Sequence, residues 1–331
     1  MKKRIAALLL AALLLPAGMH AEEVTEEIIT EEEILPAESG PLLTEDEENG
    51  IWRYESPELR IEITRYNETV KIKKKNYQRI YCVAEIWASE ASPLGFVMTE
   101  GKIPGRKQVS PELLTDKYQP VFAMSDDMYG LRLRKLDDGR YKYDYHGTVI
   151  RYGEILARKT RNSAKKRQWP NLDTMAVFGD GSVKTFVCDA HTPEEYLKMG
   201  AVHVMAFGPW LLSGGEINPD VLDPNYYPYN EPRAAIGMVE PYHYVAIAAQ
   251  GRPDGKYAGV HLDWMAEKMK EMGCTEALNL DGGATVTMFF NGKVILTGQV
   301  KTVKKQTVPD LRSQGSLIAF GLPENAPAAE K

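Results

Sequence analysis

Apolar residues along this chain follow two spacings, the two-residue period of strands and the 3.6-residue period of helices. The strand spacing occurs more often, so the pattern predicts a sheet-rich fold with few helices. Leu59–Tyr66 alternates apolar and polar positions, and Arg79–Trp87 is a second run rich in β-forming residues. Val121–Met124, Val202–Phe207 and Tyr242–Ala249 are shorter apolar runs of strand length. We therefore predict an α+β fold, a single domain with a mixed, largely antiparallel sheet and few helices.

The helical period is clearest in the stretch before Gly273. One face of the predicted helix carries apolar residues at i, i+3, i+4, i+7 and i+10, namely Leu262, Met265, Ala266, Met269 and Met272. Gly273 stands where a left-handed residue would end that helix. A second, shorter helix is predicted after Thr192, which precedes proline and has a glutamate three residues on, the pattern of a capping box.

Turn chemistry marks two hairpins in the predicted sheet. Asn291-Gly292 follows the alternating residues 285–290, and this dipeptide favours a type I′ turn. Gly179–Gly181 separates the strand-like runs 174–178 and 183–187 in the same way. Both segments are predicted to be antiparallel strand pairs.

The N-terminal 50 residues have compositions that set them apart from the rest. Residues 1–4 are basic and residues 5–15 are almost all apolar, a run too short for a comfortable membrane span and typical of a signal peptide ending at Ala21. An uncleaved anchor is the alternative. Residues 22–50 are dominated by Glu and Asp, and we predict a disordered acidic linker there. The predicted domain then covers 51–322, with a flexible tail at 323–331.

Charge and cysteine content exclude some classes of protein. The net charge of −6 disfavours a nucleic-acid partner, because phosphate backbones are bound by clustered cations. The basic run 158–167 leaves contact with an anionic polymer open. The three cysteines, Cys82, Cys188 and Cys274, lack metal-ligand spacing, and Cys82 and Cys274 lie in apolar surroundings that predict buried thiols.

Asp281-Gly282-Gly283 ends a short apolar run and is the strongest candidate for chemistry. A carboxylate and the amide of Asn279 at the end of a buried strand, followed by two glycines, allow backbone N–H groups to approach a ligand closely. From spacing alone, a simple turn explains the same residues equally well.

The residues Asn279–Gly283, followed by a small residue, a threonine and Met288, resemble the NLDGGGSSTM signature of the phosphodiester glycosidase domain family. Other pieces resemble family motifs in the same chain order. They are the loop Ser125–Gly130, the strand and turn Gly147–Gly153, the turn Gly208-Pro209, the segment Pro232–Gly237, the pair Gly251-Arg252 and the closing strand Leu311–Phe320. The resemblance thus extends from about Trp52 to the end of the predicted domain.

The resemblance implies a hydrolase that breaks sugar-1-phosphodiester bonds, of the N-acetylglucosamine-1-phosphodiester type, in glycans or envelope polysaccharide. It implies a carbohydrate or glycosyl-phosphate substrate, association with the cell envelope, secreted or periplasmic localisation, and neither a cofactor nor a metal ion. Its catalytic residues would be Asp281, Asp127 and Arg233. Its substrate-binding residues would be Asn279, Gly282, Gly283, Thr285, Arg252, Gly208 and Tyr129.

Several positions depart from the family pattern and support a second hypothesis. Ser125 replaces asparagine, Gln250 replaces aspartate, and Ala284 to Val286 replace a glycine and two small hydroxyl residues. The alternative function is a carbohydrate-binding or envelope-assembly module on the same fold. An acid–base or cation-binding role for Asp126 and Asp127 also competes with simple turn capping.

Overall fold

A nine-stranded antiparallel sheet forms the centre of the structure, a computed structural model that describes residues 40–101, 105–127, 133–135, 141–143, 147–159, 171–251 and 256–323. These residues belong to one compact unit, Gly40–Lys331. The strands of the sheet are, in spatial order, β1 (Leu42–Asp46), β2 (Ile51–Glu55), β3 (Arg60–Ile72), β4 (Lys75–Trp87), β17 (His243–Ala249), β16 (Arg233–Glu240), β18 (Glu276–Asn279), β14 (Trp210–Ser213) and β15 (Glu216–Ile217).

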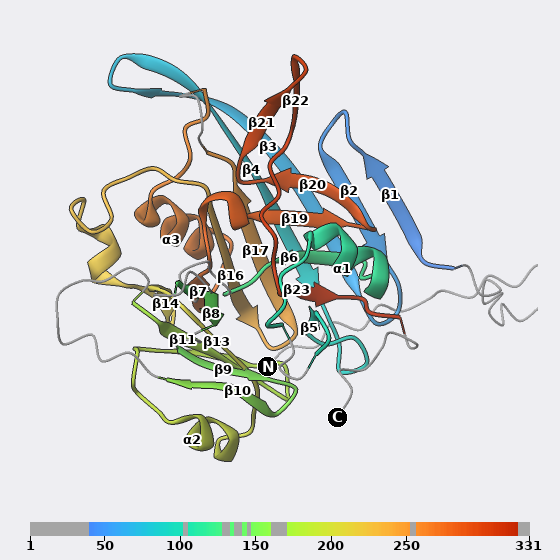
Figure 1. Ribbon diagram of the computed structural model, residues 1–331, viewed down its shortest axis with the longest axis vertical. Coiled ribbons are helices and arrows are strands. Elements are labelled where there is room, and N and C mark those ends of the chain that lie inside the picture. Colours follow the sequence, from blue (N-terminus) through green and yellow to red (C-terminus); the bar gives the residue numbers. More distant parts are fainter. Residues whose placement is uncertain are drawn as a thin grey trace, which may run out of the picture. The chain divides into compact units, whose positions relative to one another are not determined.

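Two five-stranded sheets and two small hairpins complete the β-structure (Figure 1). One sheet has the order β10 (Glu154–Lys159), β9 (Gly147–Arg151), β13 (Ala201–Phe207), β11 (Asp173–Phe178) and β12 (Val183–Phe186). The other has the order β20 (Lys293–Thr297), β19 (Thr287–Phe290), β6 (Phe122–Ser125), β23 (Ser316–Phe320) and β5 (Gly95–Met98). The hairpins are β21 (Val300–Val303) with β22 (Gln306–Pro309), and β7 (Leu133–Lys135) with β8 (Tyr141–Tyr143).

The described part of the chain contains three α-helices, which lie outside the sheets. They are α1 (Pro111–Tyr118), α2 (Pro193–Lys198) and α3 (Leu262–Glu271). Strands far outnumber helices and the paired strands run antiparallel, apart from an isolated parallel bridge between Gln78 and Tyr257. The predicted α+β fold with a mixed, largely antiparallel sheet is therefore confirmed.

The nine-stranded sheet is buried on both faces at its central strand β17, which explains the unbroken apolar run in that strand. On one face Val245 and Ile247 pack with Met265 and Met269 of α3. On the other face Ala246 belongs to the main core, shared with the sheet that contains β6, β19 and β23. A strand that is covered on both sides needs apolar residues at every position, and alternation is lost.

Local signals in the sequence are confirmed at three turns and caps. Helix α3 ends in a Schellman motif, in which Gly273 has φ +83° and the N–H groups of Gly273 and Cys274 donate to Lys270 O and Met269 O. Thr192 and Glu195 form the capping box of α2. Asn291 and Gly292 both have positive φ and join β19 to β20.

The prediction of disorder over 22–50 is wrong for residues 42–46, which form strand β1 on the edge of the large sheet. Acidic composition argues against burial, yet an edge strand needs only backbone pairing, which β2 supplies. The acidic residues are also used: Asp46 accepts from Asn49 N, and Glu45 pairs with Lys293 and accepts from Asn291 Nδ2.

The sequence missed one helix and correctly predicted the burial of two cysteines. Helix α1 was not predicted, although Ser110 followed by Pro111 is an N-terminal helix signal. The buried state predicted for Cys82 and Cys274 is confirmed, and burial raises the pKa of each thiol to about 12.

Candidate active site

The end of β18 places the Asp-Gly-Gly turn beside the start of β16. Asn279 lies opposite Ala235, and Leu280 N donates to Ala234 O at 2.8 Å. Two more residues in this register bring Asp281 across from Arg233. Gly283 N then donates to Pro232 O at 3.0 Å, and a Cβ on Gly282 would lie only 2.7 Å from that oxygen. Glycine is therefore required where the turn passes Pro232.

Asn279 joins the turn to the Gly208-Pro209 segment after β13. Its Nδ2 donates to Gly208 O at 2.9 Å, and Gly208 N donates to Asn279 O at 3.1 Å. Because Nδ2 faces two carbonyls, that of Gly208 and that of Leu280, the amide orientation is fixed. The buried Oδ1 has no hydrogen-bond partner among the described residues. It can accept a hydrogen bond from a ligand.

Asp173 holds the Gly208-Pro209 segment in place. Its carboxylate accepts from Trp210 N at 3.0 Å and from Cys188 N at 2.9 Å. Gly208 has φ +80°, and a Cβ there would lie 2.8 Å from the Cβ of Asp173. Burial raises the pKa of Asp173, which is the cost of fixing this turn from inside the domain.

Asp281 has a partly exposed arginine beside it. Arg312 Nη1 lies 4.0 Å from Asp281 Oδ2 and donates to Thr285 Oγ1 at 2.9 Å. The side chain of Arg312 is 45% exposed, whereas that of Asp281 is 9% exposed. The pair thus has a carboxylate set into the protein and a cation that reaches solvent. Sequence reasoning placed Arg312 in the closing segment but did not select it for the site.

The chain just before β23 contributes a second unsatisfied acceptor near Thr285. Gln314 Nε2 donates to Thr285 O at 3.0 Å and to Thr287 Oγ1 at 3.2 Å, while its buried Oε1 has no partner in the described part of the chain. Thr285 lies in the short 3-10 helix η3 (Gly283–Thr285) and is 1% exposed. Its hydroxyl orients Arg312 rather than facing solvent.

Asp126 and Asp127 follow β6 and are completely buried. Asp127 Oδ1 lies 2.5 Å from Arg151 Nη2, and Oδ2 accepts from Ala206 N at 2.6 Å. Asp126 accepts from Ser316 Oγ and lies 3.7 Å from the same guanidinium. We refer to Asp126, Asp127 and Arg151 as the buried ion cluster. It meets the candidate site through Asp281 N, which donates to Asp126 O at 3.2 Å.

Arg233 is 4% exposed, and its guanidinium donates hydrogen bonds to backbone carbonyls of the protein. Its Nε donates to Val260 O at 3.0 Å, and its Nη2 donates to Tyr229 O at 3.1 Å. These contacts fasten two connecting segments to the start of β16. Arg233, Asn279 and Asp281 are brought together, while Asp127 reaches the same region through its neighbour Asp126.

The sequence profile of the phosphodiester glycosidase family matches residues 136–312, slightly more than half of the chain. The chain belongs to the phosphodiester glycosidase family. The matched range contains Arg233, Asn279 and Asp281, and its last residue is Arg312. A search of curated protein sequences finds no match to this chain.

Two solved structures are similar to this chain in fold. The catalytic domain of zebrafish N-acetylglucosamine-1-phosphodiester alpha-N-acetylglucosaminidase, auto-inhibited by its pro-peptide, superposes with a TM-score of 0.58 and 17% identity, covering 81% of this chain and 85% of that chain. A hypothetical protein from Synechocystis gives a TM-score of 0.50 and 12% identity, covering 80% of this chain and 62% of that chain.

One departure from the family signature does not face a ligand. Val286 is fully buried and packs in the main core, so an apolar residue there completes the packing beneath η3. Gln250, by contrast, lines a cavity beside β20. Tyr129 and Arg252, both predicted to bind substrate, lie outside the described residues.

Metal and membrane features were also sought in the described residues. Within them, no group of three or more His, Cys, Asp or Glu side chains is arranged to hold a metal ion. None of their helices has the length and apolar character needed to cross a membrane.

Proposed function

We propose that this member of the phosphodiester glycosidase family hydrolyses sugar-1-phosphodiester bonds, of the N-acetylglucosamine-1-phosphodiester type, in glycans or envelope polysaccharide. The observation that carries the proposal is the pairing of Asp281 with the half-exposed Arg312 beside a glycine turn. This reaction requires a carboxylate, a cation and backbone donors close together.

Hydrolysis at the anomeric carbon breaks the bond between that carbon and a phosphate oxygen. Positive charge develops on the sugar ring, and the phosphate monoester leaves with the bonding electron pair. Water then adds to the anomeric carbon and loses a proton. Because phosphate is a good leaving group, stabilising its charge matters more than protonating it.

Asp281 suits the sugar side of this reaction, as the base that accepts the proton of water or as a negative charge facing the ring. Arg312 suits the phosphate, since its guanidinium is accessible and presents a planar set of donors. Arg233 supports the same region from the start of β16. Asn279 Oδ1 would accept from a sugar hydroxyl. The backbone at Gly282 is proposed as a further substrate contact, because the N–H groups of Asp281 and Gly283 already donate to Asp126 O and Pro232 O.

The remaining predicted residues take supporting parts in the proposal. Gly208 and Thr285 position Asn279 and Arg312 through hydrogen bonds. Asp127 is proposed as a positioning residue, because both of its carboxylate oxygens already accept hydrogen bonds inside the buried ion cluster. Tyr129 and Arg252 are proposed as further substrate contacts on the family resemblance alone.

We also propose export, with residues 1–21 removed as a signal peptide and 22–39 as a linker to the folded unit. The support is the basic, then apolar, then acidic order of the N-terminal sequence. Mass spectrometry of the protein from fractionated cells should find a mature chain beginning at Glu22. A full-length chain in the membrane fraction would instead favour the uncleaved anchor.

Release of a phosphate monoester from a panel of glycosyl phosphodiesters tests the activity. Asp281→Asn is nearly isosteric and should lower kcat/KM by about 10²–10⁴-fold, the range for losing a general base. Asp310→Asn is the matched control, because it makes the same substitution at an aspartate that pairs with Lys301 on the surface. Equal loss in both variants, or full activity in Asp281→Asn, would contradict the assignment.

A second candidate function, glycan binding without turnover, is favoured by one observation. Asp126 and Asp127, which the resemblance offers as a second acidic group, are both engaged by Arg151 and neighbouring donors. Specific binding of sugar phosphates without turnover of any substrate in the panel would support this alternative.

A further inference from the structure

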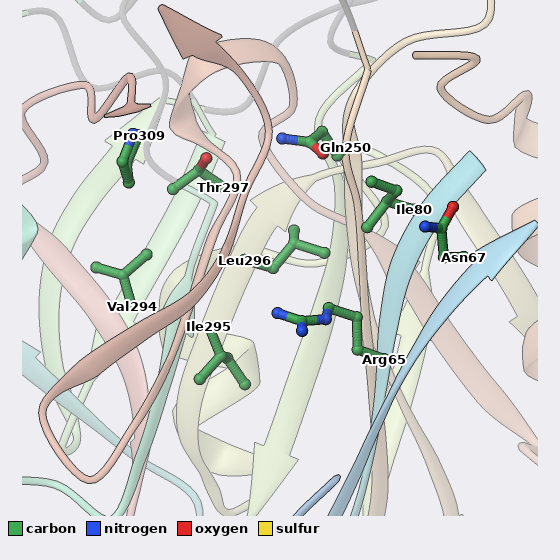
Figure 2. A pocket seen from close by; sticks show the side chains of 9 residues that line it. All are labelled: Arg65, Asn67, Ile80, Gln250, Val294, Ile295, Leu296, Thr297 and Pro309. Atoms are coloured by element: carbon green, nitrogen blue, oxygen red, sulfur yellow. The ribbon is translucent and has the colours of Figure 1, made fainter. Parts of the chain in front are cut away.

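A cavity of about 350 Å³ lies between the nine-stranded sheet and β20, apart from the residues assigned to the candidate site (Figure 2). Alternation along β3 explains its chemistry. Ile61 and Ile63 point into the main core, and the next positions on that face are Arg65 and Asn67. Polar residues therefore replace apolar ones where the sheet reaches the cavity.

Gln250 is the most informative residue of the lining. It is 8% exposed, and its side-chain amide makes no hydrogen bond with any described residue, although its backbone N donates to Ile80 O at 2.9 Å. Figure 2 shows this amide extending from the end of β17 toward the cavity. An amide that lines a cavity and has no partner in the protein keeps its donors and acceptor available for a molecule bound there.

Arg65 brings a positive charge to the same cavity. Its Nη2 donates to Glu47 O at 2.7 Å, and its guanidinium lies 5.2 Å from the ring centre of Trp52. Arg65 has no carboxylate ion-pair partner among the described residues. In Figure 2 its side chain extends from β3 toward Ile295 and Leu296 of β20. The charge is thus held against an apolar wall, where a bound anion would be attracted more strongly than in water.

We propose that this cavity binds a sugar carrying an anionic group, a carboxylate or a phosphate. Arg65 would bind the anion. The amides of Gln250 and Asn67 and the hydroxyl of Thr297 would bond to sugar hydroxyls, and Ile80 and Leu296 would contact the C–H face of the ring. The volume is at the lower end of the range for small-molecule sites, which suits one sugar unit.

The cavity shares a wall with the candidate active site but is separate from it. Gly251 N donates to Gly298 O at 2.9 Å, and a Cβ on Gly298 would lie 2.1 Å from Gly283 O. Gln250 and Thr297 are the sequence neighbours of these two glycines. The proposal concerns binding and does not depend on hydrolysis by Asp281.

Calorimetric titration with glucuronate, glucose 1-phosphate and glucose tests the proposal, and each should be titrated into wild type, Asp281→Asn and Gln250→Glu. Wild type should bind one or both anionic sugars at least about tenfold more tightly than glucose, and Asp281→Asn should retain that binding. Gln250→Glu keeps the shape of the side chain but adds a negative charge. It should weaken anionic-sugar binding by about tenfold or more.

Two controls keep the test decisive. Gln306→Glu places the same charge on the exposed surface of the neighbouring β22 and should leave affinity within about twofold of wild type. Arg65→Met should remove the preference for anionic sugars, whereas Arg53→Met, at an exposed position of β2, should not. If Arg65→Met fails to fold, Gln250→Glu still decides the outcome. Undetectable binding, equal affinity for glucose, or binding unaffected by Gln250→Glu would overturn the proposal.

Discussion

Two carboxylate–arginine groups lie side by side in this protein and differ in burial. The side chain of Arg151 in the buried ion cluster is 2% exposed, and those of its two aspartates are at most 1% exposed. Backbone groups and the Ser316 hydroxyl make further hydrogen bonds to the cluster. The pair of Asp281 and Arg312 is looser, at 4.0 Å, and its arginine is 45% exposed. The same residue types can therefore hold a fold together or remain accessible to a ligand.

The difference follows from the energetics of buried charge. A fully desolvated ion pair is stable only when every donor and acceptor is matched, so it cannot change partners easily. A half-exposed pair gains little stability, and its arginine can turn toward a substrate at small cost. We therefore expect the buried ion cluster to govern folding, and Asp281 with Arg312 to govern activity.

The largest expected effect is on stability when the buried ion cluster is broken. Asp127→Ala leaves Arg151 buried without its main partner and should lower the free energy of unfolding by about 3–5 kcal/mol. Urea denaturation of both proteins measures this change. The cluster would instead belong to the chemistry if Asp127→Ala kept wild-type stability while turnover disappeared.

Arg312→Ala should show the opposite pattern. Loss of a charge that stabilises the departing phosphate should lower kcat/KM by an amount equivalent to about 3 kcal/mol. Stability should fall by less than about 1 kcal/mol, because the Arg312 side chain is half-exposed and its ion pair is long, at 4.0 Å. Arg60→Ala is the control, since the Arg60 side chain is also 45% exposed but pairs with Glu62 elsewhere in the sheet. A similar loss of activity in Arg312→Ala and Arg60→Ala would contradict the assignment of Arg312 to the candidate site.

His203, which lies near Arg151 of the buried ion cluster, should make the stability of the protein depend on pH. Burial, and then the charge of nearby Arg151, lower the pKa of His203 to about 3. Unfolded chains take up this proton near pH 6.5, so folded protein loses stability as pH falls from 6.5 toward 3. By pH 5 the loss from this group should reach about 2 kcal/mol.

Denaturation curves at several pH values measure this loss in wild type and in His203→Gln, which cannot titrate. The slope of stability against pH should flatten in His203→Gln. Equal slopes in wild type and His203→Gln would show that His203 is not held neutral.

The smallest effect is expected at Thr285, which orients Arg312. Thr285→Val removes the hydroxyl that accepts from Arg312 Nη1 while keeping the shape of the side chain. We expect kcat/KM to fall by an amount equivalent to about 1 kcal/mol, the net value of one hydrogen bond. In the Arg312→Ala background the same change should have no further effect, because the partner is already missing.

Most of the fold's local structure could be predicted because it depends on neighbouring residues. The end of α3 at Gly273, the capping box of α2 and the Asn291-Gly292 turn each need only a few consecutive side chains. Strand β1 could not be predicted this way. Its pairing partner is β2, and its acidic residue Glu45 is neutralised by Lys293, which is distant in sequence.

The candidate site could be predicted where its residues lie close together in one sequence motif. Asn279, Asp281 and the two glycines lie within five residues, so their approach to one another was fixed locally. The role of Asp127 was not predictable, because its partners are Arg151 and the backbone of Ala206, 24 and 79 residues away. Arg312 was missed for the same reason, since nothing near it in sequence indicates that it faces Asp281.

The sequence by itself determined which residues are available for chemistry and where several strands and helices end, as at Gly273 and Asn291-Gly292, because these features depend on short-range periodicity, caps and turns. Only the tertiary structure decided which charges are buried. Asp127 and Asp281 are the same residue type, each at the end of a short buried strand. Long-range packing surrounds one with Arg151 and backbone donors and leaves the other beside an accessible arginine. The free energy of a charge depends on its surroundings, and those surroundings come from segments far away in the chain.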